Sequence, residues 1–169
     1  MFKRFSILIL SILCLLISNT TLKAEKQFEV DANVTYKVEA TGKTLVTHDV
    51  TLENLLSTFY ATTYTLSLEN ISAESVKAID ANGKPIQVDL QENGKSLDVK
   101  LTFSDAVLGK NAKRHFKISY ENSNFAVKTG EVWEISIPRL SDNRSFRDYQ
   151  INLEIPDSYG QEAYICPAA

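Results

Sequence analysis

The side chains that could perform chemistry in this sequence are few and lie far apart. The histidines are His48 and His115, and the cysteines are Cys14 and Cys166. A zinc site requires closely spaced Cys and His ligands, and a cysteine nucleophile requires a histidine base that a third group orients. The spacing of these four residues matches neither pattern. The sequence therefore predicts no catalytic residue, no cofactor-binding residue and no metal ligand, and it predicts that the chain is not an enzyme.

One loop contains several side chains that could act as calcium ligands. Ca²⁺ binds clustered oxygen ligands, and Ser141-Asp142-Asn143, with Asp148 nearby, offers several. Arg139, Arg144 and Arg147 stand in the same loop and would oppose a cation. These arginines can instead pair with the neighbouring acids, or bind a partner's carboxylate through two parallel hydrogen bonds. We predict a solvent-exposed loop of ion pairs rather than a calcium site.

The remaining candidates are residues on predicted strand faces. His48 shares a face with Val46 and Val50, which favours a core or edge histidine with satisfied ring nitrogens over a metal ligand. Trp133 and most tyrosines share faces with Ile and Val residues, so we interpret them as core, with Tyr159 as the exception. Replacing a core tryptophan with alanine costs about 3–5 kcal/mol, which is the expectation for Trp133. A carbohydrate-binding module would instead expose an aromatic platform, for which the candidates are Trp133, Tyr60, Tyr64 and Tyr120.

The first 24 residues have the layout of an export signal. Lys3 and Arg4 precede an apolar run over residues 5–17, and a polar stretch then leads to the small residue Ala24. This order is typical of a cleaved secretory signal, and the run is shorter than the roughly 20 apolar residues of a membrane-spanning helix. We predict a signal peptide over 1–24, a β-sandwich domain over 25–160 and a C-terminal tail over 161–169, in a secreted or extracytoplasmic protein. An uncleaved signal-anchor and a lipid on Cys14 are the alternatives.

Cleavage leaves an acidic domain with one cysteine. Three of the 18 Lys and Arg side chains and none of the 21 Asp and Glu side chains lie in the signal, so the net charge falls to near −6. A basic face supplies most of the affinity for nucleic acid, and a polybasic patch that for anionic lipid. We therefore expect no nucleic-acid partner and a membrane contact only through an uncleaved signal. Cys166 is left without an internal partner, so no disulfide within the domain is expected.

The rest of the chain alternates apolar and polar residues with a period of two, which is typical of half-buried strands. Regular short strands separated by turn signals favour a two-sheet sandwich. We predict one all-β domain, an immunoglobulin-like antiparallel β-sandwich of about nine strands. The alternating segments are 28–38, 46–52, 60–68, 76–80, 86–90, 97–103, 116–120, 125–127, 133–137 and 149–155.

Two Asn-Gly pairs give the clearest turn signals. Asn82-Gly83 and Asn93-Gly94 separate the strands predicted over 76–103. Asn-Gly favours positive φ at both central residues of a type I′ turn, whose twist matches the flanking strands. The sequence therefore predicts two such turns and a three-stranded meander.

A family resemblance covers most of residues 40–156. The segment GKNAKRHFKISYENSNFAVKTGEVWEISIPRL, followed by DYQINLEIP, resembles a β-sandwich region found ahead of transglutaminase-like domains in secreted bacterial proteins. The earlier VTHDVTLENLLSTFYATTYTLSLEN fits the same pattern. More distantly, the layout is similar to the luminal β-domain of ribophorin I. The resemblance implies an extracytoplasmic accessory module beside an enzyme, because its motifs are strands and turns rather than catalytic residues.

The resemblance carries over no functional residue. A transglutaminase-like site uses a cysteine that precedes its histidine along the chain, whereas Cys166 follows both His48 and His115. We expect the catalytic part of that family to be absent here. The leading hypothesis is a non-catalytic exported module whose partner is another protein or a covalently linked downstream domain. The alternatives are a carbohydrate- or envelope-binding module and a hydrolase of unrecognised type.

Overall fold

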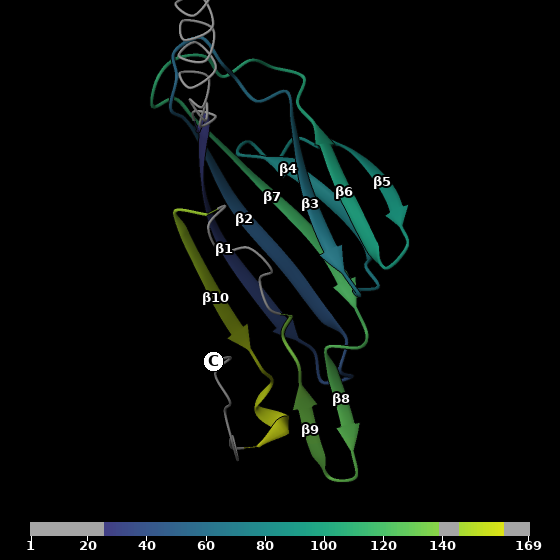
Figure 1. The fold of residues 1–169 in the computed structure, drawn as a ribbon. Coiled ribbons are helices and arrows are strands. Elements are labelled where there is room, and N and C mark those ends of the chain that lie inside the picture. The colour runs from purple at the N-terminus through teal and green to yellow at the C-terminus, as the bar shows by residue number, and fades with distance from the viewer. Residues whose placement is uncertain (1–25, 139–145, 161–169) are drawn as a thin grey trace, which may run out of the picture.

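The computed structural model describes residues 26–138 and 146–160 of the chain (Figure 1). The predicted signal peptide, the residues 141–143 that were weighed as calcium ligands, and the tail with Cys166 all lie outside these residues. In the part described, no helix is both long and apolar enough to span a membrane. The elements are β1 (Phe28–Val38), β2 (Thr44–Asn54), β3 (Thr63–Glu69), β4 (Glu74–Asp80), β5 (Gln87–Asn93), β6 (Ser96–Thr102), β7 (Lys113–Asn122), β8 (Ala126–Thr129), β9 (Val132–Ile135), β10 (Asp148–Glu154) and the 3-10 turn η2 (Asp157–Tyr159).

The strands form three sheets of different width. A five-stranded sheet has the order β10-β1-β2-β7-β4, and a three-stranded sheet has the order β3-β6-β5. These two sheets pack face to face, while β8 and β9 form a separate hairpin at one end (Figure 1). The predicted all-β sandwich is confirmed, with ten strands described instead of about nine.

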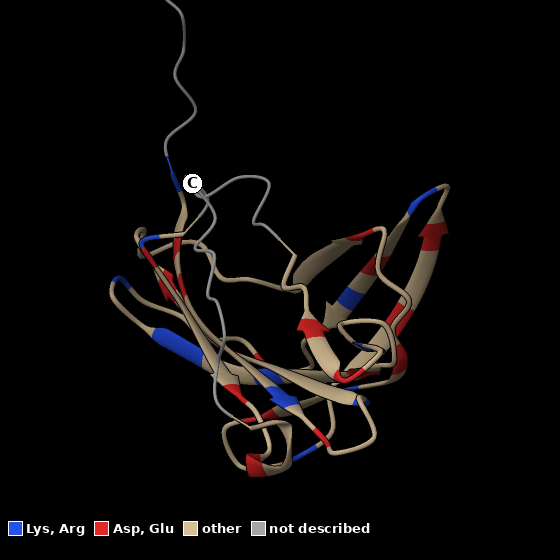
Figure 2. Cartoon of the chain, turned by 90° about the horizontal axis from the view of Figure 1, so that it is seen from below, with Lys and Arg blue, Asp and Glu red and all other residues tan. Residues whose placement is uncertain are grey.

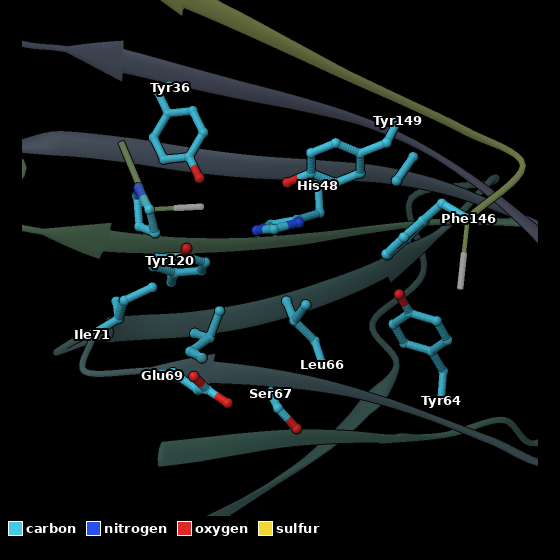
Figure 3. Close-up of a pocket in the computed structure, with 13 residues that line it drawn as sticks. Tyr36, His48, Tyr64, Leu66, Ser67, Glu69, Ile71, Tyr120, Phe146 and Tyr149 are labelled. Carbon is cyan, nitrogen blue, oxygen red and sulfur yellow. The ribbon is translucent and has the colours of Figure 1, made fainter. Parts of the chain in front are cut away.

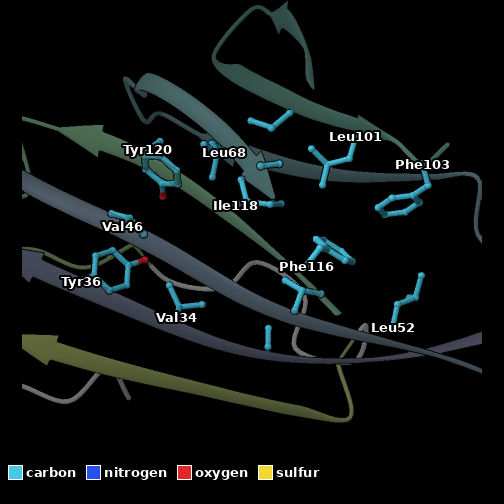
Figure 4. Close-up of a cluster of buried hydrophobic side chains, with 14 of the residues drawn as sticks. Val34, Tyr36, Val46, Leu52, Leu68, Leu101, Phe103, Phe116, Ile118 and Tyr120 are labelled. Atoms are coloured by element: carbon cyan, nitrogen blue, oxygen red, sulfur yellow. The ribbon is translucent and has the colours of Figure 1, made fainter. Parts of the chain in front are cut away.

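The core lies between the two larger sheets because their strands alternate as the sequence predicts. In β2, in β7 and in β1 from Ala32 onward every second side chain is buried, and Val34, Val46 and Ile118 have no exposed surface. Apart from Leu45, the intervening positions carry polar residues on the outer side of the sheet. Leu68, Val99 and Leu101 complete the core from the three-stranded sheet (Figure 4).

One strand pair departs from the predicted antiparallel arrangement. The last strand, β10, lies parallel to the first, β1, with Asp31 opposite Asp148 and Lys37 opposite Glu154. The other paired strands in the described residues are antiparallel. Alternation within a strand reveals its buried face but not the direction of its neighbour, so this pairing could not be predicted from the pattern.

Arg147 links the start of β10 to β1 and β2 through hydrogen bonds and ion pairs. Its backbone N–H donates to the Val30 carbonyl (2.8 Å), and its Nε donates to Asp31 Oδ1 (2.9 Å). Its Nη1 donates to Glu29 Oε2 (2.7 Å) and to Glu53 Oε2 (3.0 Å). The hydrogen bond from Arg147 holds the pKa of Asp31, and likewise that of Glu53, below its usual range. Arg147 therefore forms the solvent-exposed ion pairs predicted for its loop, but with acids of other strands.

The first Asn-Gly turn differs from the type I′ prediction. Gly83 N–H donates to the Asp80 carbonyl (3.0 Å), and Asp80 N–H donates to the Lys84 carbonyl (2.9 Å). Gly83 has a φ of +78°, whereas Asn82 is not among the residues with positive φ. This is a type I turn followed by a glycine bulge. The Asp80 carboxylate selects it by accepting the N–H groups of Asn82 and Lys84.

The second Asn-Gly turn also differs from the type I′ prediction. Asn93 pairs with Ser96, so the loop residues are Gly94 and Lys95, and of these Gly94 alone has positive φ. This is the type II′ pattern.

The predicted three-stranded meander is wrong. Among the described residues no strand ladder joins β4 to β5; a bridge links Ile79 to Pro85, which precedes β5, and Ile86 N–H donates to the Ala78 carbonyl (2.9 Å). The chain then crosses between sheets, since β4 pairs with β7 and β5 with β6.

Trp133 lies in the peripheral hairpin rather than in the core. It is half-buried on β9 and does not belong to the main core cluster of the described residues. Its ring stacks on Tyr159, with centroids 4.2 Å apart and planes 7° from parallel. The Tyr159 hydroxyl donates to the Glu39 carbonyl (2.9 Å). The core interpretation of Trp133 is therefore wrong, and Tyr159 is its stacking partner.

Gly42 allows this hairpin to lie close to the turn between β1 and β2. A Cβ atom there would lie 2.8 Å from Trp133 Cζ3 and 2.9 Å from the Ala126 carbonyl oxygen, and Gly42 has a φ of +90°. Gly83 has a similar φ but open space around it. Both Gly→Ala variants share a backbone strain of about 1–2 kcal/mol, and Gly42→Ala adds about 1–3 kcal/mol of overpacking. Urea unfolding of both variants measures the difference, and equal losses would contradict the close approach of the hairpin.

Candidate binding site between the two sheets

The five-stranded sheet extends beyond the three-stranded sheet at β10. The register places Tyr149, Ile151 and Leu153 beside Ala32, Val34 and Tyr36, whose side chains face the core. Val34 and Tyr36 are buried, yet Ile151 and Leu153 are each 44% exposed. Seen along the strands, the two sheets diverge like the sides of a V (Figure 2). The inner face of β10 is therefore an apolar surface that the second sheet does not cover.

A cavity of about 90 Å³ lies beside this surface, between β1, β2, β7 and β10 on one wall and β3 on the other (Figure 3). We call it the histidine cavity. His48, Tyr36, Tyr120 and Tyr149 line it from the five-stranded sheet, and Tyr64 and Leu66 line it from β3. The full lining is Ala32, Tyr36, His48, Tyr64, Leu66, Ser67, Leu68, Glu69, Ile71, Tyr120, Pro138, Phe146 and Tyr149.

His48 is buried as predicted, but it is not satisfied. Its side chain is 7% exposed and stacks on Tyr120, with ring centroids 5.8 Å apart. Its Nε2 is buried and has no hydrogen-bond partner among the described residues. A buried polar atom without a partner costs about 1–3 kcal/mol. Burial lowers the pKa of His48 to about 4, so the imidazole is neutral at neutral pH.

The tyrosines of the histidine cavity are also neutral. Burial raises the pKa of Tyr64 to about 12, and it raises the pKa values of Tyr36, Tyr120 and Tyr149. A neutral phenol can both donate and accept a hydrogen bond. No hydrogen bond joins His48 to a carboxylate among the described residues. The chemistry this arrangement offers is binding through apolar contact and neutral hydrogen bonds.

A second, larger pocket of about 440 Å³ lies between the start of β1 and the start of β3. We call it the aromatic pocket, and Tyr64 lines both it and the histidine cavity. Phe59 and Tyr60, in the loop before β3, are exposed at its rim. Its lining is Gln27, Phe28, Val30, Leu52, Phe59, Tyr60, Ala61, Thr62, Thr63, Tyr64 and Thr65.

The four aromatic residues expected for a carbohydrate platform do not lie together on the surface. Tyr120 is in the core, and Trp133 stacks on Tyr159 in the peripheral hairpin. Tyr64 is half-buried between the two pockets, and Tyr60 is exposed. These four residues therefore form no single exposed platform.

The second histidine lies apart from the pockets. His115 is exposed on the outer side of β7, where its Nδ1 lies 2.9 Å from Thr51 Oγ1. In the described ranges no three His, Cys, Asp or Glu side chains are grouped so that they could hold a metal ion. Sequence reasoning placed His48 in the interior but did not detect either pocket. The lining comes from strands that meet only in the folded sheets, so no local pattern signals it.

Comparisons with known proteins give similarities of strand arrangement only. No protein-family model and no curated protein matches the sequence. An M1 zinc metallopeptidase from Deinococcus radiodurans aligns with 67% of this chain at 11% identity and a TM-score of 0.39. The pilus backbone protein of Streptococcus pneumoniae aligns with 57% of it at 19% identity and a TM-score of 0.34. A GH20 exo-β-N-acetylglucosaminidase from Vibrio harveyi aligns with 85% of it at 13% identity and a TM-score of 0.37. The aligned parts span 25%, 27% and 20% of those chains, respectively.

Proposed function

We propose that this chain is a non-catalytic β-sandwich module that works outside the cytoplasm and binds a protein partner on the open side between its two sheets. The observation that carries the proposal is the inner face of β10, which the second sheet does not cover and where Ile151 and Leu153 are each 44% exposed although they face the core side of the sheet. Apolar side chains that face inward without cover are typical of interaction sites. Beside this face, the histidine cavity adds the buried His48 Nε2, which has no hydrogen-bond partner in the described ranges.

The sequence supports the compartment and the accessory role. The layout of residues 1–24 is that of an export signal. The resemblance to the region ahead of transglutaminase-like domains favours a module that assists an enzyme domain, either on the same polypeptide or on a separate protein. In this proposal the module supplies a binding surface and the partner supplies any chemistry.

Site-specific photo-cross-linking in the native host tests the binding role. A photoreactive phenylalanine analogue at Leu153 is expected to give a discrete cross-linked species with the exported chain. The matched control is the same analogue at Thr102, which is exposed at the end of β6 and lines neither pocket. Cross-links of equal yield from both positions, or none from Leu153, would contradict the proposed binding face.

A further inference from the structure

The outer edge of β10 pairs with no other strand in the described part of the chain. β10 is the terminal strand of the five-stranded sheet, and among the described residues it pairs with β1 alone. A strand at the edge of a sheet presents a row of unpaired N–H and C=O groups that can pair with another chain. In Figure 1, β10 stands at the border of the sheet.

The central five residues of this edge lack the features that normally protect one. Edge strands are usually blunted by charged residues, prolines or bulges. Residues 149–153 contain neither a charge nor a proline, and the β1–β10 register runs without a shift. β4, at the opposite edge of the same sheet, has a register shift between Glu74 and Lys77 and a positive φ of 54° at Ser75. The two edges of one sheet therefore differ, and β10 is unprotected along residues 149–153.

An added strand would also cover the exposed inner face. Side chains alternate between the two faces of a strand, and neighbouring strands lie about 4.7–4.9 Å apart. Every second side chain of a strand paired with β10 would therefore lie next to Tyr149, Ile151 or Leu153 on the inner side. The inner face of β3, an edge strand of the smaller sheet, is already covered, because its inward Leu68 is buried and its Leu66 is half-buried.

The charges at the two ends of β10 decide which kind of strand fits. Asp148 and Glu154 occupy the first and last positions of the strand. They lie on the same outward face as Gln150 and Asn152. Antiparallel pairing of two copies of β10 about Ile151 would place Asp148 of each copy opposite Glu154 of the other. Like charges directly opposite each other are destabilising, so this pattern disfavours a second copy and favours a strand with basic ends.

We propose that β10 accepts an extended segment of a partner protein as an added antiparallel strand. The segment carries apolar side chains at alternate positions, facing Tyr149, Ile151 and Leu153, and basic side chains opposite Asp148 and Glu154. Main-chain hydrogen bonds supply affinity in such strand addition, and alternate side chains supply specificity. This inference rests on the proposed function and names the chemistry of the partner at the same face.

A heptapeptide tests the proposal on the full chain without its signal. The probe is Lys-Val-Thr-Val-Thr-Val-Lys with blocked ends, whose valines match the three inward positions and whose lysines match the two acids. At low salt we expect it to shift the NMR signals of the β10 amides and to leave those of β4 unchanged. Two control peptides carry glutamate at both ends or proline in place of the central valine. We expect each control to bind at least tenfold more weakly, and equal affinity for all three would overturn the proposal.

Variants of the chain separate the edge from general charge attraction. Ile151→Lys places a charge on the inward face and is expected to abolish binding, while Gln150→Lys adds the same charge on the outward face and is expected to weaken binding less than fivefold. Asp148→Lys combined with Glu154→Lys is expected to transfer the preference to the glutamate-ended peptide. Far-UV circular dichroism and the Tm show whether each variant is folded. Peptide binding by folded Ile151→Lys at wild-type affinity would overturn the proposal.

Two outcomes distinguish this inference from the proposed function. Cross-linking from Leu153 in the host, combined with no peptide binding, would reject strand addition by a basic segment and leave the binding role intact. The absence of both the Leu153 cross-link and peptide binding would reject both the proposed function and strand addition. Analytical ultracentrifugation adds a check, because a dimer that Ile151→Lys dissociates would assign the edge to a second copy and overturn the proposed partner.

Discussion

Replacing Phe116 with alanine is expected to lower the free energy of unfolding by about 3–5 kcal/mol, the usual cost of truncating a buried phenylalanine. Phe116 lies on β7 and is 1% exposed. Its ring packs against Tyr64 of β3, with centroids 5.0 Å apart, and against Phe103 at the end of β6, at 5.3 Å. It therefore connects the five-stranded sheet to the three-stranded sheet at the centre of the core (Figure 4).

Trp133→Ala is the informative comparison for Phe116→Ala. Trp133 is larger, but it is half-buried in the peripheral hairpin and its main aromatic contact is with Tyr159. We expect its loss to cost about 1–2 kcal/mol, since a stacked aromatic pair contributes about 0.5–1.5 kcal/mol beyond the area it buries. Urea unfolding of both variants at pH 7 gives the two values. A larger loss for Trp133→Ala than for Phe116→Ala would restore the sequence-based interpretation of Trp133 as core.

The stability of the fold is expected to fall by about 3 kcal/mol between pH 6.5 and pH 4 because of His48 alone. Burial lowers the pKa of His48 to about 4 in the folded state, while an unfolded histidine has a pKa of about 6.5. Within this window the unfolded chain binds a proton that the folded chain does not. Acid therefore favours unfolding, and the contribution is fully present only above the unfolded pKa.

His48→Phe isolates this effect, because it keeps the stacking on Tyr120 and removes the titrating group. Urea unfolding of both proteins at several pH values from 4 to 7.5 gives two stability curves. We expect them to separate as the pH falls below about 6.5, with the variant the more stable. Carboxylates such as Asp31 and Glu53, whose pKa values lie below their usual range, act below about pH 4.5 and equally in both proteins. Parallel curves would show that His48 is not buried in its neutral form.

The strands were predictable where each has one face in the core and one in water. β1 and β2 show this most clearly, since their alternation in the sequence matches their alternation in burial. Alternation says which side chains share a face, but not what covers that face. Trp133 alternates as well as Ile118 does, yet one lies under a small hairpin and the other between two sheets. Which sheet a strand joins depends on distant partners, so the crossing from β4 to β5 and the parallel β10 could not be predicted.

The turns and the candidate site were missed for different physical reasons. At Asn82-Gly83 a neighbouring carboxylate, that of Asp80, changes the turn type that the dipeptide alone favours. The burial of His48 followed from its neighbours on β2, but its lack of a partner depends on β1, β3, β7 and β10 together. The sequence shows that residues 149–153 contain no charge and no proline. That these residues form the edge of a sheet is known only from the structure.

The pairing of the first strand with the last has a consequence for when the molecule can fold. β1 and β10 lie at opposite ends of the described chain, with Asp31 beside Asp148. Contacts between residues far apart in sequence slow folding, because the intervening loop must close before they form. If the chain is exported amino end first, as proposed above, one edge of β1 stays unpaired until Asp148–Glu154 has also crossed the membrane. Completion of the sheet would then follow translocation of β10, and a chaperone that shields β1 in that interval would protect the chain when it is most prone to aggregate.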